Sequence, residues 1–90
     1  MRKIEYSNQF KRDYKLVVKR GYDIRRLEKL ISLLRREEPL PKEYRDHALS
    51  GSLEGQRECH ITFDWLLMYK IEEDRLILTL SRTGTHDDLF

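Results

Sequence analysis

The chain has 90 residues, a formal net charge of +2 and a single cysteine. A chain of this length buries only about 60–65% of its unfolded surface, so we expect one domain over residues 1–90 with a small core. One cysteine excludes an intramolecular disulfide, which fits a reducing compartment. No apolar run approaches the roughly 20 residues of a membrane span and no signal peptide is expected before the fold, so the sequence predicts a cytoplasmic protein without membrane attachment.

The charge is unevenly distributed along the chain. Residues 1–36 contain 12 Lys and Arg against 4 Asp and Glu, whereas residues 37–90 contain 6 against 12. This asymmetry favours an amino-terminal half that faces a polyanion such as nucleic acid. The alternative is a solvated helix surface, which is the commoner meaning of a Lys/Arg-rich stretch. The candidate phosphate-binding residues in this half are Lys11, Lys15, Lys19, Arg25, Arg26 and Lys29.

The amino-terminal half predicts a strand followed by two helices. Residues 3–6 read as a short strand, and Ser7 is a typical N-cap for a helix of about 13 residues that ends at Gly21. Asp23 can cap a second helix. The apolar residues at helical spacing are Phe10, Tyr14, Val17 and Val18 in the first helix and Ile24, Leu27, Leu30, Ile31 and Leu34 in the second. The two helices should therefore form a hairpin with one shared apolar side.

The carboxy-terminal half predicts a strand meander. Pro39 and Pro41 end the second helix and begin a loop that carries Asp46 and His47. Strands are predicted over residues 56–61, 65–71 and 75–82, with a further short strand near Leu49 and a helical turn or tail over the last five residues. The expected fold class is α+β, with the helices on one face of a mostly antiparallel sheet and the other face free for a site.

The three histidines, His47, His60 and His86, each lie in a short polar motif of the second half. An imidazole can give and take a proton near neutral pH, so these residues are candidates for acid–base chemistry. Because side chains alternate along a strand, we expect Glu58 and His60 to point outward together, about 7 Å apart. Asp64 follows in the next turn and is a plausible partner that would keep His86 protonated.

The remaining residues of this region divide between the core and the site. Alternation places Cys59 and Ile61 on the opposite face from the histidine, and we expect them and Trp65 in the core. Antiparallel pairing would bring Arg82 near the same face as a phosphate ligand. No ligand pair has zinc-site spacing, so neither a metal nor another cofactor is expected. Such a set suits RNA cleavage by the 2′-OH, with a base, an acid and a cation supplied by side chains.

Three motifs occur in order along this half of the chain. They are Asp46-His47-Ala48-Leu49-x-Gly51, Arg57-Glu58-Cys59-His60-x-x-x-Asp64-Trp65 and Arg82-x-Gly84-x-His86-x-x-Leu89-Phe90. With the strand and two helices before them, they resemble the YafQ-type toxins of the RelE superfamily over essentially the whole chain. The resemblance implies a compact microbial-ribonuclease-like fold. It also implies a ribosome-dependent mRNA endonuclease, the toxin of a bacterial type II toxin–antitoxin pair.

The resemblance also implies site residues and partners. The residues that match active-site positions of the family are His47, His60, Asp64, His86 and Phe90, and Glu58 matches a position that holds Asp in some relatives. The implied partners are a cognate antitoxin in a hetero-oligomeric complex, expected to be a heterotetramer, the 70S ribosome with its rRNA, and mRNA. Operator DNA would be reached only through the antitoxin complex. The alternative is a catalytically silent RelE-fold module that binds an antitoxin or the ribosome without cleaving RNA.

Overall fold

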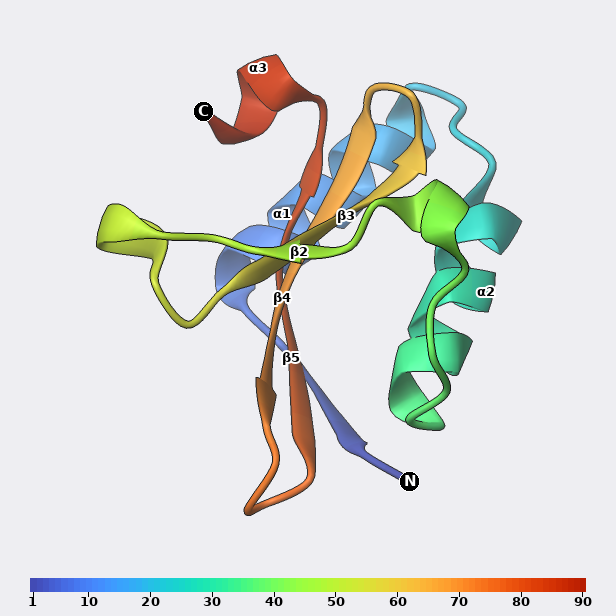
Figure 1. Ribbon diagram of the computed structural model, residues 1–90. Helices are drawn as coiled ribbons and strands as arrows, with labels where there is room; N and C mark the ends of the chain where they lie inside the picture. The colour runs from blue at the N-terminus through green and yellow to red at the C-terminus, as the bar shows by residue number, and fades with distance from the viewer.

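The computed structural model describes all 90 residues. In chain order the elements are β1 (Lys3–Tyr6), α1 (Asn8–Lys19), α2 (Ile24–Arg35), η1 (Lys42–Tyr44), β2 (His47–Ala48), η2 (Gly51–Leu53), β3 (Arg57–Thr62), β4 (Trp65–Glu72), β5 (Ile77–Gly84) and α3 (His86–Leu89) (Figure 1). The predicted α+β class is confirmed. No helix has the length and apolar character needed to cross a membrane.

The strands form one mixed sheet in the order β1-β5-β4-β3-β2. β1 pairs in parallel with β5, and the other three pairings are antiparallel, so the predicted mostly antiparallel sheet is confirmed. The hairpin of α1 and α2 lies on one side of this sheet, as Figure 1 shows. The turn between β3 and β4 and the short helix α3 lie at the same end of the sheet in that view.

Local sequence explains the helix hairpin. The Ser7 hydroxyl caps α1 by accepting a hydrogen bond from the backbone N–H of Phe10 at 2.9 Å. The Asp23 carboxylate caps α2 by accepting one from the backbone N–H of Arg25 at 3.2 Å. Gly21, between the helices, has a φ of +81°, a left-handed conformation that glycine adopts without a steric cost. The predicted capping residues and the stop at Gly21 are confirmed.

The core lies between the helices and the sheet. It consists of Phe10, Val17, Leu27, Leu30, Leu34, Cys59, Ile61, Trp65, Leu67, Tyr69, Leu78 and Leu80, and the predicted burial of Cys59, Ile61 and Trp65 is confirmed. The prediction that Val18 faces the core is wrong, because this side chain is 47% exposed. The buried stripe of α1 follows Phe10, Asp13 and Val17, and Val18 lies about 100° around the helix from Val17.

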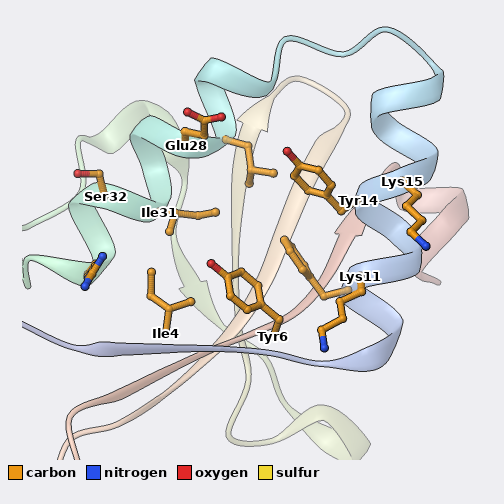
Figure 2. Close-up of a pocket in the computed structure, with 11 residues that line it drawn as sticks. Ile4, Tyr6, Lys11, Tyr14, Lys15, Glu28, Ile31 and Ser32 are labelled. Carbon is orange, nitrogen blue, oxygen red and sulfur yellow. The ribbon is translucent and has the colours of Figure 1, made fainter.

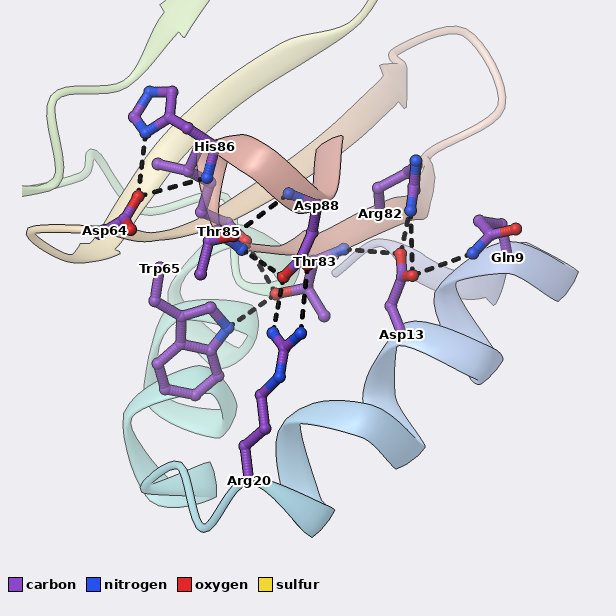
Figure 3. Close-up of polar contacts among 11 residues, drawn as sticks. Gln9, Asp13, Arg20, Asp64, Trp65, Arg82, Thr83, Thr85, His86 and Asp88 are labelled. Carbon is purple, nitrogen blue, oxygen red and sulfur yellow. Dashed lines mark hydrogen bonds and ion pairs between the residues drawn. The ribbon is translucent and has the colours of Figure 1, made fainter. Parts of the chain in front are cut away.

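The buried carboxylate of Asp13 joins α1 to the end of β5 (Figure 3). It accepts hydrogen bonds from the backbone N–H of Thr83 and from Nε and Nη2 of Arg82, each at 3.1 Å. Strand β1 stops pairing at the Tyr6–Leu80 register, so this part of β5 has no strand beside it on that edge. Asp13 therefore supplies the acceptor that a neighbouring strand would otherwise provide.

The boundaries of β3 and β4 agree with the predicted ones within one residue, whereas those of β5 and β2 differ by two. β5 runs over Ile77–Gly84 instead of residues 75–82, because Leu76 has a φ of +51° and belongs to the turn that precedes the strand. The short strand predicted near Leu49 is β2, at His47–Ala48. Within β5, Met68 pairs with Arg82 and Tyr69 with Leu80, which leaves Ser81 as the extra residue of a β-bulge.

Candidate functional site

Strand pairing places several candidate residues on the sheet face that lies opposite the core. His47 pairs with Glu58, Glu58 with Met68, and Met68 with Arg82, and residues paired across a sheet share a face. His60 lies two residues beyond Glu58 on β3 and faces the same way. That face is partly covered, since Leu66 and Met68 are buried on it.

His47 was expected in a loop but lies in β2, where its pairing with Glu58 fixes its position. Its Nδ1 donates a hydrogen bond to the backbone carbonyl of Arg45 at 2.9 Å. A carbonyl can only accept, so in the neutral ring Nε2 carries the lone pair. Nε2 lies 3.7 Å from Oε1 of Glu58, and the two form an ion pair when the ring is protonated.

The prediction that Glu58 points away from the core is confirmed by its strand pairing, but on that face the residue is buried, at 4% exposed. The reason is that β2 and β4 flank it on both sides, with His47 and the buried Met68 as its direct neighbours on the same face. Its Oε2 has no hydrogen-bond partner within the protein. Glu58 therefore combines burial with a free acceptor atom beside an imidazole.

Asp64 and His86 form the clearest polar pair of the region (Figure 3). Oδ1 of Asp64 accepts hydrogen bonds from the backbone N–H of His86 at 3.2 Å and from its Nδ1 at 3.1 Å. These bonds, the side-chain bond first, hold the pKa of Asp64 below its ordinary value of 3.8. The expected contact is confirmed, and it leaves Nε2 of His86 as the ring nitrogen available for proton transfer.

His60 and Phe90 complete this group on either side of His86. The ring centroids of His60 and His86 are 5.8 Å apart, and those of His86 and Phe90 are 6.3 Å apart. Nδ1 of His60 is buried and has no hydrogen-bond partner within the protein. Phe90 is 62% exposed, so one aromatic face is open to a ligand. We call His60, Asp64, His86 and Phe90 the histidine site.

The helix α3, which carries His86, is stabilised by a capping box at its start and is joined to the end of α1 by an ion pair. The Thr85 hydroxyl accepts from the backbone N–H of Asp88 at 3.1 Å, and Oδ2 of Asp88 accepts from the backbone N–H of Thr85 at 2.9 Å. Arg20, after α1, donates to both carboxylate oxygens of Asp88 at 2.6 and 3.2 Å. A Cβ on Gly84 would lie 2.8 Å from Oδ2 of Asp88, so a glycine is required beside this contact.

A second set of hydrogen bonds, which the sequence did not reveal, positions β2. The Asp46 carboxylate accepts hydrogen bonds from the Tyr69 hydroxyl and from Arg57, whose Nη2 is 2.7 Å away. Burial, followed by the bond to Asp46, raises the pKa of Tyr69. Asp46 immediately precedes His47, so this contact to the core side of the sheet anchors His47 on the other side. The adjacency of Asp46 and His47 was visible in the sequence, but the partners of Asp46 were not.

The predicted phosphate-binding residues fall into different surroundings. Arg82 is held by Asp13, so part of its guanidinium is already committed, and Arg25 pairs with Asp23 at 3.2 Å. Lys19 ends α1. Lys11 and Lys15 line a groove of about 800 Å³ bounded by β1, α1 and α2 (Figure 2), which lies away from the histidines. Arg26 and Lys29 line a second groove, of about 710 Å³, to which His60 also contributes.

The donor set for metals is sparse. No three or more His, Cys, Asp or Glu side chains are grouped so that they could hold a metal ion. The thiol of Cys59 is buried, and burial raises its pKa, which makes it a poor ligand or nucleophile at neutral pH.

Comparison with known proteins gives consistent matches over the whole chain. Residues 2–90 match the sequence profile of a family described as "Bacterial toxin of type II toxin-antitoxin system, YafQ". The mRNA interferase toxin YafQ of Escherichia coli (strain K12) is 46% identical over 90 residues, covering 99% of this chain and 96% of that protein.

Two solved structures have the same fold and similar sequences. The YafQ chain of the E. coli DinJ–YafQ complex superposes with a TM-score of 0.90 at 45% identity, covering 100% of this chain and 99% of that chain. A metal-bound toxin from Helicobacter pylori superposes with a TM-score of 0.93 at 43% identity, covering 100% of both chains.

The contact between Arg20 and Asp88 predicts how stability depends on pH. The bond from Arg20 is the largest cause that holds the pKa of Asp88 well below its ordinary value of 3.8. A carboxylate with a lowered pKa stabilises the folded state above pH about 4, and this contribution is lost as the pH falls through the folded-state pKa. The wild type should therefore exceed Arg20→Ala in stability at pH 7, and the difference should shrink as the pH is lowered from 4 to 2.

Urea unfolding of both proteins across this pH range measures the difference. Arg12→Ala is the matched control, since Arg12 bonds only to Gln9 and no carboxylate. A difference between wild type and Arg20→Ala that stays constant down to pH 2 would contradict the assignment.

Proposed function

Because this chain belongs to the YafQ family of bacterial toxins of type II toxin–antitoxin systems, we propose that it is an endoribonuclease toxin that cleaves mRNA on the ribosome and so inhibits translation. The observation that carries the proposal is the contact of Asp64 with Nδ1 of His86 beside His60 and Phe90. It presents an oriented imidazole next to a second one and an exposed aromatic ring. The two imidazoles can supply the base and the acid that cleavage of RNA by its own 2′-OH requires, and the aromatic ring can stack on a base.

The reaction needs one proton removed and one supplied. A base takes the proton of the 2′-OH, whose oxygen attacks the adjacent phosphorus, and the bond from phosphorus to the 5′ oxygen breaks. His86 donates its Nε2 proton to that leaving oxygen, because the contact of its Nδ1 with Asp64 fixes the ring and leaves Nε2 free. His60 or Glu58 is the base. The products are a 2′,3′-cyclic phosphate and a free 5′-hydroxyl.

The remaining site residues stabilise and position the RNA. His47, held against Glu58, contributes a positive charge near the phosphate when its ring is protonated. Arg82 contributes a second, with its guanidinium oriented by Asp13. Phe90 stacks on a base and limits the access of water. In this arrangement the catalytic residues are His47, Glu58, His60, Asp64, His86 and Phe90.

The reaction proceeds without a resident metal in our proposal. The H. pylori relative was crystallised with bound metal. The donors of this chain do not fit such a group, since no three of them are clustered. Every proton transfer in the scheme is assigned to an imidazole or a carboxylate, and no step is routed through an ion.

The partners follow from the charge distribution and from the relatives. The basic residues of α1 and α2, Lys11, Lys15, Lys19, Arg25, Arg26 and Lys29, would hold rRNA through phosphate contacts. The E. coli relative has been crystallised with DinJ. We infer that a cognate antitoxin neutralises this chain in a heterotetramer, which contacts operator DNA through the antitoxin, and that both act in the bacterial cytoplasm.

Expression in bacteria without an antitoxin tests the function. We expect growth arrest, with new 5′ ends inside translated mRNAs. Purified protein that has been treated with EDTA and desalted should still cleave mRNA on intact ribosomes. A catalytically silent module that only occupies the ribosome would arrest growth without producing such ends. Normal growth with abundant folded protein would contradict both.

The role of His86 as the acid predicts a specific rescue. Loss of a general acid costs about 10² to 10⁴ in rate, so His86→Ala should slow single-turnover cleavage on ribosomes at least about 100-fold with little change in ribosome affinity. A substrate with sulfur in place of the 5′ leaving oxygen needs no protonation. His86→Ala should cleave it nearly as fast as wild type, whereas His60→Ala should remain slow. Failure of the sulfur substrate to rescue His86→Ala would reassign His86 as a base or a phosphate ligand.

The charge of α1 predicts a salt-dependent grip on ribosomes. Reversing Lys11, Lys15 and Lys19 to Glu should weaken association and lower the slope of log affinity against log salt by about 1 for each phosphate that is no longer bound. The matched control reverses Lys42, Lys70 and Arg75, which changes the net charge equally on other elements. Co-sedimentation with ribosomes across a salt series measures both, and equal effects of the two triple variants would show that only total charge matters.

A further inference from the structure

Phe63 is the most exposed large apolar side chain of the molecule. It is 90% exposed and lies in the turn between β3 and β4, next to Asp64. A ring this open is not part of the core and gains almost nothing from folding. Its value to the protein therefore depends on what it can contact outside the chain.

The ring borders the groove of about 710 Å³ to which His60 contributes. We call it the Phe63 groove, and the lining residues that matter for its chemistry are Arg26, Lys29, Arg45, His60, Thr62 and Phe63. They come from α2, from the residue after η1, and from the end of β3 and its turn. Since β2 pairs only with Arg57 and Glu58, the later part of β3 is a free sheet edge along this groove.

The groove carries uncompensated positive charge. Arg26 has only a distant carboxylate, that of Asp23 at 4.0 Å, and it is 62% exposed. Lys29 and Arg45 are exposed and take part in none of the ion pairs of the chain. Glu43 is the one acidic residue of the lining. Lys29 and Arg45, which have no ion-pair partner, and the weakly paired Arg26 outweigh Glu43 and favour an anionic ligand.

His60 also lines this groove. Its Nδ1 is buried and lacks a hydrogen-bond partner within the protein. The groove is thus continuous with the histidine site, because His60 belongs to both.

We propose that the Phe63 groove binds one nucleotide of the mRNA beside the scissile phosphate, with its base stacked on Phe63 and its phosphate held by Lys29 and Arg45. This inference rests on the proposed function and names a subsite for its substrate. An aromatic face with cations around it is the combination that holds single-stranded RNA, since the ring stacks on the base and the cations pair with the backbone. Through this subsite the nucleotide next to the cut contributes to the choice of cleavage site.

Three substitutions of Phe63 separate stacking from simple apolar contact. Removing a base–aromatic stack by substitution to alanine lowers affinity about 5- to 150-fold, so Phe63→Ala should raise the KM for cleavage on ribosomes by at least about fivefold with kcat little changed. Phe63→Trp, which keeps an aromatic ring, should keep the wild-type KM, whereas Phe63→Leu should raise the KM as Phe63→Ala does. Val18→Ala, which removes an exposed apolar side chain on α1, should leave cleavage unchanged.

A binding measurement does not depend on cleavage. The F63W variant places an exposed indole in the groove, and its fluorescence should be quenched saturably by an RNA hexamer carrying 2′-O-methyl groups, which cannot be cut. The same backbone lacking bases should quench far less. Positions of mRNA 5′ ends should also shift between wild type and Phe63→Ala.

The outcomes distinguish this inference from the function on which it rests. If Phe63→Ala cleaves at the wild-type sites with the wild-type KM, the proposed RNA subsite is overturned and the proposed endonuclease function is unaffected. If neither the wild type nor any Phe63 variant cleaves mRNA, the proposed endonuclease function is wrong. The hexamer experiment then tests the groove alone: base-dependent quenching supports the RNA subsite, and the lack of it overturns the subsite. Weakened antitoxin binding by Phe63→Ala with unaltered cleavage would assign the groove to a protein partner and overturn the RNA subsite.

Discussion

The buried carboxylate of Asp13 holds α1 against the end of β5. The position of His86 and Phe90, which follow β5 in the chain, depends on that contact. Asp13 fixes the backbone of Thr83 and the guanidinium of Arg82. The Thr83 hydroxyl in turn accepts from Nε1 of Trp65 at 2.9 Å and donates to the Leu66 carbonyl at 2.7 Å, which secures the start of β4. Asp64 and Gly84 directly adjoin these secured residues, so both partners of the Asp64–His86 pair are positioned from one point.

The chemistry is therefore supported from the side of the sheet that it does not use. Asp13 and Arg20 belong to the helix hairpin, and Asp46 reaches Tyr69 on the core side. The candidate catalytic side chains lie on the opposite face or at the end of the sheet. This division lets the core provide rigidity while His47 and His86 stay about half exposed, and it lets a small domain hold several polar side chains in order.

The sequence predicted the elements well because their signals are local. Ser7, Gly21 and Asp23 act within a few residues, and the alternation that buries Cys59 acts within one strand. The contact of Asp64 with His86 was also expected, because antiparallel pairing would bring the end of the last strand near the turn that holds Asp64. The catalytic roles of these residues stay predictions. The errors and omissions arise from contacts between distant parts of the chain. The burial of Glu58 was missed because nothing local reveals that β2 flanks it. The partners of Asp13 and Arg20 lie about 70 residues away, and in the sequence both read as ordinary charges on a helix surface.

The parallel pairing of β1 with β5 has a consequence for the timing of synthesis. The first strand of the chain cannot pair until β5 has been made. Likewise, Asp13 and Arg20 cannot bind Thr83 and Asp88 until those residues have been made. Contacts of such high sequence separation form late. While β5 and α3 are still inside the exit tunnel of the ribosome that makes them, His86 cannot meet Asp64. The contact between His86 and Asp64 is thus made only after these last elements have emerged.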